Sequence, residues 1–218
     1  MIPRILHTVW VGPRPFPEVF KKFRLTWMKH NPQWTFMFWG NNNLPELVNK
    51  DLIDSIKCPA SKTDIIRCEV LYRYGGVYSD ADSYCLKPLS PLIENLDCFS
   101  MTGREGLVAN GTMGCSLNNH LFKEIVFGFK DHMSDIAERE KKGESFTIFH
   151  KAGCLYIHPI LDGKDGFTQI DKGRIIGTRR LICAYGDKDI SKAYINHKNT
   201  RIWEIGMRRV EHISKTYK

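Results

Sequence analysis

A short stretch between residues 60 and 82 holds the side chains with the clearest chemical potential. Asp64 and Arg67 lie three residues apart on an expected helix, so they share one face of it. Asp80 and Asp82 follow an apolar run that reads as a buried strand. Two neighbouring carboxylates repel each other unless a cation lies between them, and such hard oxygen ligands suit Mg²⁺ or Mn²⁺. These residues predict a divalent-metal site that keeps coordination positions for substrate oxygens, typically those of a diphosphate.

The elements on either side of this stretch are expected to bring the charged residues together. Ser61-x-x-Asp64 resembles a capping box, which predicts a helix with Asp64 and Arg67 in its first two turns, where the dipole favours an anion. Gly75-Gly76 ends that helix, and the strand that follows leads into the two later aspartates. Ligands of parallel α/β sheets bind outside the carboxyl ends of the strands. We therefore expect one shared site at that edge.

The rest of the chain predicts the sheet and its covering helices. The first strand, helix and second strand form a β-α-β opening, which implies parallel strands joined by a right-handed crossover. The expected fold class is α/β, a single domain with a mostly parallel central sheet flanked by helices. Periodicity and turn residues place strands at 5–11, 34–39, 98–102 and 107–113, and helices at 18–30, 44–57 and 121–140.

The composition narrows the partners and the compartment. The chain has 218 residues, with 32 Lys+Arg against 24 Asp+Glu, so its net charge is +8. Basic residues are spread along the chain without a recognition-helix or RNA motif, so we expect no nucleic-acid partner. No apolar run reaches the ~18 residues that span a bilayer, and the apolar N-terminus is too short for a signal peptide. The seven cysteines have no zinc-ribbon spacing, which favours free thiols in a reducing compartment and a cytoplasmic location.

Three segments of the sequence carry a family resemblance. The run ASKTDIIRCEVLYRYGGVYSDAD closely resembles the DXD-containing block of glycosyltransferase family 32. That family includes yeast initiating mannosyltransferases, bacterial capsule-type glycosyltransferases and, more distantly, the glucosylating clostridial toxins. The opening IPRILHTVWVGP is similar to the family's first strand, and NHKNTRIW at 196–203 is similar to its closing His-x-x-x-x-Ser-Trp pattern. The resemblance implies one GT-A-type domain over 1–218, with a nucleotide-sugar-binding half at 1–120 and an acceptor side and closing loop at 121–218.

The resemblance implies a role for several residues near the donor. Trp10 would stack on the nucleotide base, beside the backbone of Val9 and Val11. Asp64 would hydrogen-bond hydroxyl groups of the donor sugar, and Arg67 would contact the sugar or the diphosphate. These five residues are the first group of expected donor contacts.

A second group of implied roles concerns the metal and the anomeric centre. Within the DXD motif, Asp80 would contact ribose and sugar or reach the metal through water, Ala81 would lie against the donor, and Asp82 would ligate the metal directly. Asn110, in the stretch VANGTMG, would touch the donor sugar near its anomeric carbon.

The closing segment completes the set. His197 and Trp203 would come from a C-terminal loop that closes over the diphosphate, with His197 as the last metal ligand beside the two DXD aspartates. Ile202 occupies the position where the family commonly has Ser. A hydroxyl contact to the diphosphate is therefore missing or supplied by Thr200.

Together these features predict a metal-dependent, retaining glycosyltransferase. It would move a hexose from a nucleotide diphosphate sugar, with a UDP-sugar favoured over a GDP-sugar, to a hydroxyl of a glycan or glycolipid, using Mn²⁺ or Mg²⁺. Peripheral membrane contact is kept as an alternative for the basic C-terminal tail. Two other functions stay open at this point: a sugar nucleotidyltransferase, and a non-catalytic basic module that binds polyanions. The donor sugar, the acceptor, the linkage and the oligomeric state are not encoded in any feature that we recognise.

Overall fold

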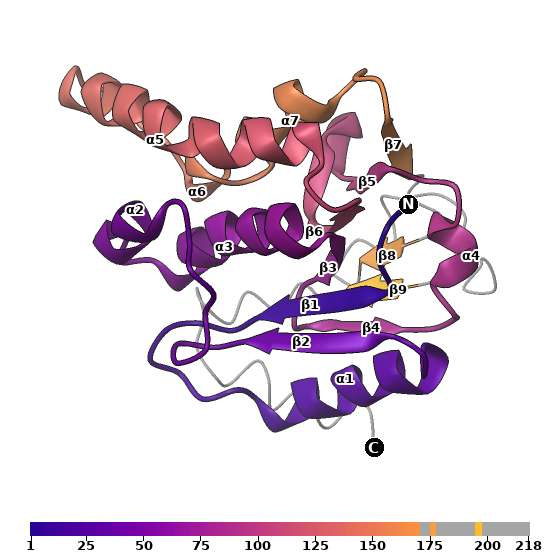
Figure 1. Ribbon diagram of the computed structural model, residues 1–218. Helices are drawn as coiled ribbons and strands as arrows, with labels where there is room; N and C mark the ends of the chain where they lie inside the picture. Colours follow the sequence, from indigo (N-terminus) through magenta and orange to yellow (C-terminus); the bar gives the residue numbers. More distant parts are fainter. Residues whose placement is uncertain (171–174, 178–194, 198–218) are drawn as a thin grey trace.

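A six-stranded sheet forms the centre of the molecule (Figure 1). The computed structural model describes residues 1–170, 175–177 and 195–197. The strand order is β2-β1-β3-β6-β5-β7. The strands span Ile5–Val9 (β1), Thr35–Trp39 (β2), Gly76–Ser79 (β3), Cys98–Thr102 (β5), Val108–Cys115 (β6) and Phe167–Ile170 (β7).

The sheet is mostly parallel, as predicted. β1 pairs in parallel with both β2 and β3, and β5 pairs in parallel with β7. Only β6 is reversed among these six strands, because it pairs antiparallel with β3 and with β5. The β-α-β opening is confirmed, since helix α1, Glu18–His30, connects the parallel strands β1 and β2.

Helices cover both faces of the sheet. α3, α5 and α7 pack on one face, and α1 lies on the other (Figure 1). A second, three-stranded sheet has the order β4-β9-β8. The remaining elements are α2 (Lys50–Ser55), α3 (Pro59–Tyr74), β4 (Ser83–Cys85), α4 (Ser90–Ile93), a 3-10 turn at Arg104–Gly106, α5 (His120–Lys141), α6 (Ile148–Lys151), α7 (Cys154–Leu161), β8 (Ile175–Gly177) and β9 (Ile195–His197).

Side chains alternate across the sheet, as expected for a strand that is buried on both faces. Val9 packs on the α3 side of β1, whereas Leu6 packs on the α1 side. His7 is fully buried on the α3 side, where its Nδ1 accepts from the Trp39 indole (3.1 Å) and its Nε2 donates to the Gly75 carbonyl (2.9 Å). Burial lowers the pKa of His7 to about 4, so this histidine is a neutral core residue.

The expected capping box at Ser61 is wrong. α3 begins at Pro59 with Cys58 as its N-cap residue, and Ser61 is buried inside the helix. Proline is favoured in the first turn because its fixed backbone angle suits a helix and no amide bond is lost there. The earlier start places Asp64 in the second turn and Arg67 in the third. Because the dipole acts mainly within the first turn, it does not contribute directly at Arg67.

The glycine pair that follows α3 ends the helix, as predicted. Gly75 and Gly76 have φ values of 62° and 94°, which side-chain-bearing residues rarely adopt. A Cβ atom on Gly76 would also lie 2.6 Å from the carbonyl oxygen of Ile5. The close approach of two backbones at this point lets β3 enter the sheet directly beside β1.

Two expectations concern the whole chain. Within the ranges that the structure describes, no helix combines the length and the apolar character that a membrane span requires. The division into a donor half at 1–120 and an acceptor half at 121–218 stays a prediction.

Candidate functional site

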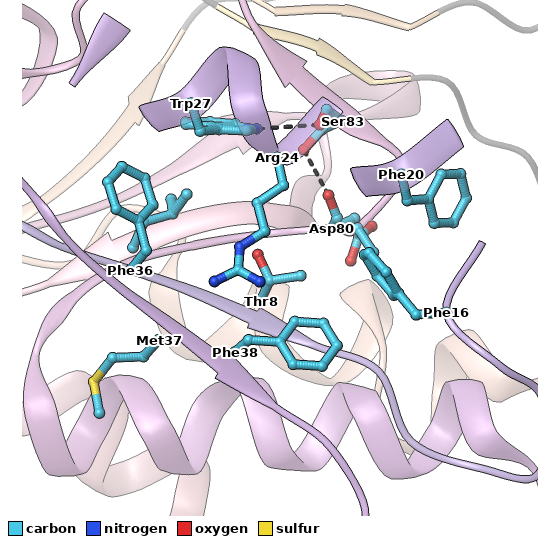
Figure 2. A pocket seen from close by; sticks show the side chains of 12 residues that line it. Thr8, Phe16, Phe20, Arg24, Trp27, Phe36, Met37, Phe38, Asp80 and Ser83 are labelled. Carbon is cyan, nitrogen blue, oxygen red and sulfur yellow. Dashed lines mark hydrogen bonds between the residues drawn. The ribbon is translucent and has the colours of Figure 1, made fainter. Parts of the chain in front are cut away.

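The DXD motif lies in a tight turn that is held on both sides. The amide of Ser83 donates to the carbonyl of Asp80 (3.0 Å), and the amide of Asp80 donates to the carbonyl of Gly111 on β6 (2.9 Å). The Ser83 hydroxyl also donates to the Asp80 carbonyl (2.6 Å), and the Trp27 indole of α1 donates to the Ser83 carbonyl (3.1 Å) (Figure 2). The turn is therefore fixed at the carboxyl end of β3.

Arg67 connects the residues of the predicted site. Its Nη2 atom lies 3.0 Å from Oδ1 of Asp64 and 3.3 Å from Oδ1 of Asp80. Its Nη1 atom donates to the carbonyl of Asn110 (2.5 Å). One buried cation thus holds two carboxylates and the start of β6 together. With Asp82, which follows in the same turn as Asp80, we call these residues the donor edge: Asp64, Arg67, Asp80, Asp82 and Asn110.

Asn110 joins this cluster because β6 runs against β3. Ser79 pairs with Thr112 in the antiparallel ladder, which places the start of β6 beside the end of β3. The Asn110 side-chain amide donates to Oδ1 of Asp64 (2.8 Å). The structure therefore brings Asp64 and Asn110 into contact, although they are far apart in the sequence.

Tyr78 is a member of the site that the sequence reasoning missed. Its hydroxyl donates to Oδ1 of Asp80 (2.7 Å), and its ring lies 4.6 Å below the guanidinium carbon of Arg67. A signal was present, because alternation along a strand puts residues 78 and 80 on the same face. A buried aromatic ring under a cation adds a stabilising cation–π contact.

Burial governs the charges of the donor edge. It raises the pKa of Asp64 to about 7, against the opposing effects of the Arg67 charge and of the hydrogen bond from Asn110. Burial by itself would lower the pKa of Arg67, but the neighbouring carboxylates of Asp80 and Asp64 outweigh it and hold the pKa above its ordinary value. Arg67 is therefore a permanent cation that is shared between two carboxylates.

The chemistry of the donor set fits a divalent cation bound largely through its substrate. Asp80 and Asp82 offer hard carboxylate oxygens from one fixed turn, and Mg²⁺ typically takes one or two carboxylates plus substrate phosphates. Among the residues that the structure describes, no group of three or more His, Cys, Asp or Glu side chains could form a complete protein cage. A two-carboxylate site that substrate oxygens complete is therefore the arrangement that these residues support.

The residues expected at the nucleotide base lie beside an aromatic cluster. Trp10 is half-buried, meets Phe16 and Phe20 edge to face at centroid distances of 5.7 and 5.8 Å, and donates from its indole to the Arg14 carbonyl (2.9 Å). Ala81 packs against the same cluster. Base stacking by Trp10 stays a prediction. The expected contact of the Val9 and Val11 backbone with the nucleotide also stays a prediction.

A small pocket lies on the α1 side of the DXD turn. Its lining includes Thr8, Arg24, Phe38 and Asp80 (Figure 2). The cavity volume is about 20 Å³, which is room for roughly one water molecule. The pocket as it stands is too small for a nucleoside.

The closing segment is described only in part. The backbone of His197 pairs with Ser83 across β4 and β9, next to the DXD turn. The side chain of His197 lies outside the described part of the chain, as do Thr200 and Trp203. The expected metal ligation by His197 and diphosphate contact by Trp203 stay predictions.

The sequence comparisons agree with the resemblance. Residues 17–98 match the family described as a glycosyltransferase sugar-binding region containing a DXD motif. Inositol phosphoceramide mannosyltransferase 3 of Schizosaccharomyces pombe is 24% identical over 167 residues, which are 72% of this chain and 44% of the relative. Mannosyl phosphorylinositol ceramide synthase SUR1 of Saccharomyces cerevisiae is 30% identical over 138 residues, 61% of this chain and 36% of the relative. The chain thus spans less than half the length of these relatives.

Solved structures support the fold. A glycosyltransferase involved in glycosylation of the major capsid of PBCV-1 superposes with a TM-score of 0.56 at 12% identity, over 97% of this chain and 99% of the other. The galactosyltransferase LgtC superposes with a TM-score of 0.55 at 11% identity, over 97% of this chain and 95% of the other. The predicted GT-A-type fold and the resemblance to DXD-containing glycosyltransferases are both confirmed. These relatives and structural neighbours are glycosyltransferases, the enzyme class that the sequence predicts.

Proposed function

We propose that this chain transfers a hexose from a nucleotide diphosphate sugar to a hydroxyl group of a glycan or glycolipid, with retention at the anomeric carbon. The observation that carries the proposal is the position of Arg67 between Asp64, Asp80 and the Asn110 carbonyl. This arrangement supports a preformed donor site, because its charges need no rearrangement before the sugar nucleotide arrives. The names of the mannosyltransferase relatives add support for a hexose donor.

Each residue of the donor edge has a proposed part in binding. Asp64 and the Asn110 amide would hold donor-sugar hydroxyl groups, since they lie in contact beside the carboxyl end of β3. Arg67 makes its contacts with protein groups and is 7% exposed, which favours a positioning role. It would fix the carboxylates of Asp64 and Asp80 in the directions that the donor requires.

Asp82 and Asp80 would hold a divalent cation at the DXD turn. When bound, that ion would neutralise negative charge on the diphosphate leaving group. The protein contributes a turn that is already fixed by Ser83 and Gly111, so the carboxylates do not have to be ordered when the donor binds.

The proposed transfer is a front-face substitution. The acceptor oxygen forms a bond to the anomeric carbon while the bond from that carbon to the β-phosphate oxygen breaks. The proton of the acceptor hydroxyl passes to the departing phosphate oxygen, so that a glycoside and a nucleoside diphosphate are formed. Asp64 is held by Arg67 and Asn110, an arrangement that favours orienting the sugar over attack on it.

Thermal unfolding with UDP-, GDP- and CMP-sugars, each with and without Mn²⁺, tests the proposal. We expect a metal-dependent stabilisation by one diphosphate sugar, because a ligand at ~100 times its Kd adds about 2.7 kcal/mol. In a transfer assay, Asp82→Asn should reduce turnover at least ~100-fold, since stabilisation of the leaving group is lost. Asp131→Asn, which removes an exposed carboxylate on α5, is the matched control and should behave as the wild type.

The alternatives predict different results in the same experiments. A sugar nucleotidyltransferase would release pyrophosphate from a nucleoside triphosphate and a sugar phosphate. A polyanion-binding module would bind nucleic acid with steep salt dependence and show no preference among sugar nucleotides. Wild-type turnover in Asp82→Asn would contradict the metal assignment. The cytoplasmic location stays a prediction.

A further inference from the structure

A second cavity lies between the start of α3, the middle of α5 and the short helix α6, which pack against one another (Figure 1). Its volume is about 340 Å³, which falls within the ~300–1,000 Å³ of typical small-ligand sites. Its walls are largely apolar, through Met133, Phe146 and Ile148. Three polar side chains line its end at the start of α3: Lys57, Cys58 and Ser61. The cavity therefore has the make-up of a site for a small molecule with one polar end.

Ser61 contributes a buried hydroxyl group to this polar end. The residue is 5% exposed, and among the residues that the structure describes none forms a hydrogen bond with its side chain. The hydroxyl groups of Thr26 on α1 and Ser134 on α5, by contrast, donate to carbonyls of their own helices. Because buried polar groups are nearly always hydrogen-bonded, a buried hydroxyl group that lines a cavity without a protein partner indicates a ligand with an acceptor oxygen.

The start of α3 also lacks the side-chain cap that such a helix usually has. Cys58 is the N-cap residue, and its side chain makes no capping hydrogen bond. Oxygen-bearing side chains normally accept from the first amides of a helix, which have no partner within it, whereas a thiol is only a weak acceptor. Ser61 is the third residue of the helix. An anion beside its hydroxyl group would therefore meet the positive end of the helix dipole as well.

The charges that line the cavity favour an anion with a single charge. Lys151, which lines it from α6, is paired with Glu140 (2.7 Å). Lys57 is exposed, and within the described part of the chain no carboxylate forms an ion pair with it. One positive charge at the polar end is thus left without a counter-charge. It matches one carboxylate better than it matches a phosphate monoester, which carries nearly two charges.

Contacts outside the cavity hold its apolar wall in place. The guanidinium carbon of Arg139 lies 4.7 Å from the centre of the Phe146 ring, and Arg139 is itself paired with Glu144 (2.6 Å). Nε2 of His132 on α5 donates to the carbonyl of His150 on α6 (2.7 Å). The wall is therefore tied to α5 at two points. A hydrocarbon body placed against it would gain free energy from the burial of apolar surface.

We propose that this cavity binds an apolar monocarboxylate, which is a small organic acid with a hydrocarbon body. Its carboxylate accepts from the Ser61 hydroxyl group at the start of α3 and lies near the ammonium group of Lys57. Its hydrocarbon body packs against Met133, Phe146 and Ile148. The site shares no residue with the donor edge, and the inference does not depend on the proposed transferase activity.

Calorimetric titration of the full chain with octanoate, below its critical micelle concentration and without a sugar nucleotide, tests the inference. We expect one octanoate per chain, bound at least ~10-fold more tightly than octanol, which has the same hydrocarbon chain but no charge. Ser61→Ala should weaken octanoate binding about 10-fold, since a hydrogen bond to a charged group is lost. Lys57→Gln should weaken it about 3-fold and remove most of its salt dependence.

The matched control is Lys123→Gln, which removes an exposed lysine of α5 that does not line the cavity and should bind octanoate as the wild type does. Four results would overturn the inference: equal affinity for octanoate and octanol, tighter binding of octyl phosphate than of octanoate, several octanoate molecules per chain, or unchanged affinity in Ser61→Ala. Because Lys57 is exposed, Lys57→Gln remains informative if Ser61→Ala does not fold, and unchanged affinity and salt dependence in it would equally contradict the site.

Discussion

The donor edge and the cavity between α3, α5 and α6, which we call the groove, are built on opposite principles. At the donor edge, charged groups are buried and bonded to fixed partners, as in the contacts of Arg67 with Asp64 and Asp80 at 3.0 and 3.3 Å. In the groove the walls are apolar, and the charges stand at the rim beside solvent. The difference is one of preorganisation, because the donor edge holds its charged groups in fixed directions whereas the groove offers an apolar wall with few fixed polar contacts.

The same substitution on the two sides gives the largest expected contrast. Arg67→Met would leave the buried Asp64 carboxyl group and the half-buried Asp80 carboxylate without their cation, so we expect a loss of about 3 kcal/mol in the free energy of unfolding. Arg139→Met, beside the groove, removes ion pairs with Asp135 and Glu144 from a side chain that is 44% exposed. This variant should change the free energy of unfolding by less than ~1 kcal/mol. Chemical denaturation of both variants measures the two changes in the free energy of unfolding. Similar losses would mean that the two sides are not distinct.

The titration of Asp64 gives the next effect. Its pKa is raised by burial to about 7 in the folded protein, so the native state holds this proton more tightly than the unfolded chain does. The protonated Asp64 carboxyl group therefore adds to the free energy of unfolding at low pH, and this contribution is lost as the pH rises through 7. Asp64→Asn has no such titrating group. Between about pH 4 and 7 the free energy of unfolding of the wild type should therefore fall relative to that of the variant, by up to ~1.4 kcal/mol per pH unit.

Denaturation of both proteins across this pH range measures the difference. The comparison must be made against the wild type at each pH, because His7, with its pKa lowered to about 4, contributes a slope of opposite sign below about pH 6.5. Parallel stability curves for variant and wild type would show that Asp64 is ionised throughout. A matched Asp131→Asn variant should give parallel curves, since that carboxylate is exposed.

The smallest expected effect concerns the helix that supports the groove. The Asn119 side chain accepts hydrogen bonds from the amides of Leu121 and Phe122 at the start of α5. Asn119→Ala should lower the free energy of unfolding by about 1 kcal/mol, and Asn119→Ser should restore most of it. Donor-induced thermal shifts should be the same in all three proteins. A weaker donor shift in Asn119→Ala would show that the groove side and the donor edge are coupled.

Much of the donor edge could be predicted because its parts are close together in the sequence. Helix, glycine turn, strand and DXD turn follow one another between residues 59 and 83, and each leaves a local signature. The start of α3 was misassigned because Ser61 and Asp64 match a cap pattern, whereas Pro59 fixes the helix two residues earlier. The partner of Arg67 on β6 is a backbone carbonyl, which no side-chain pattern can reveal.

The groove left no comparable signature. Its lining comes from residues 56–61, 133 and 146–152, and these segments become neighbours only when α5 and α6 pack against α3. Ile148 and Phe146 read as ordinary core residues in sequence, since apolar residues are equally common in buried positions and in ligand grooves. Only tertiary packing distinguishes the two.

The reversed strand β6 determines where residues could be inserted without moving Asn110. Asn110 owes its place to pairing with β3, where Val77 faces Gly114 and Ser79 faces Thr112, and not to the hairpin tip at residues 103–107. Residues added at that tip would extend into solvent while the Asn110 amide kept its position beside Asp64. Insertions at residues 103–107 are therefore expected to leave the contacts of Asn110 with Asp64 and Arg67 unchanged.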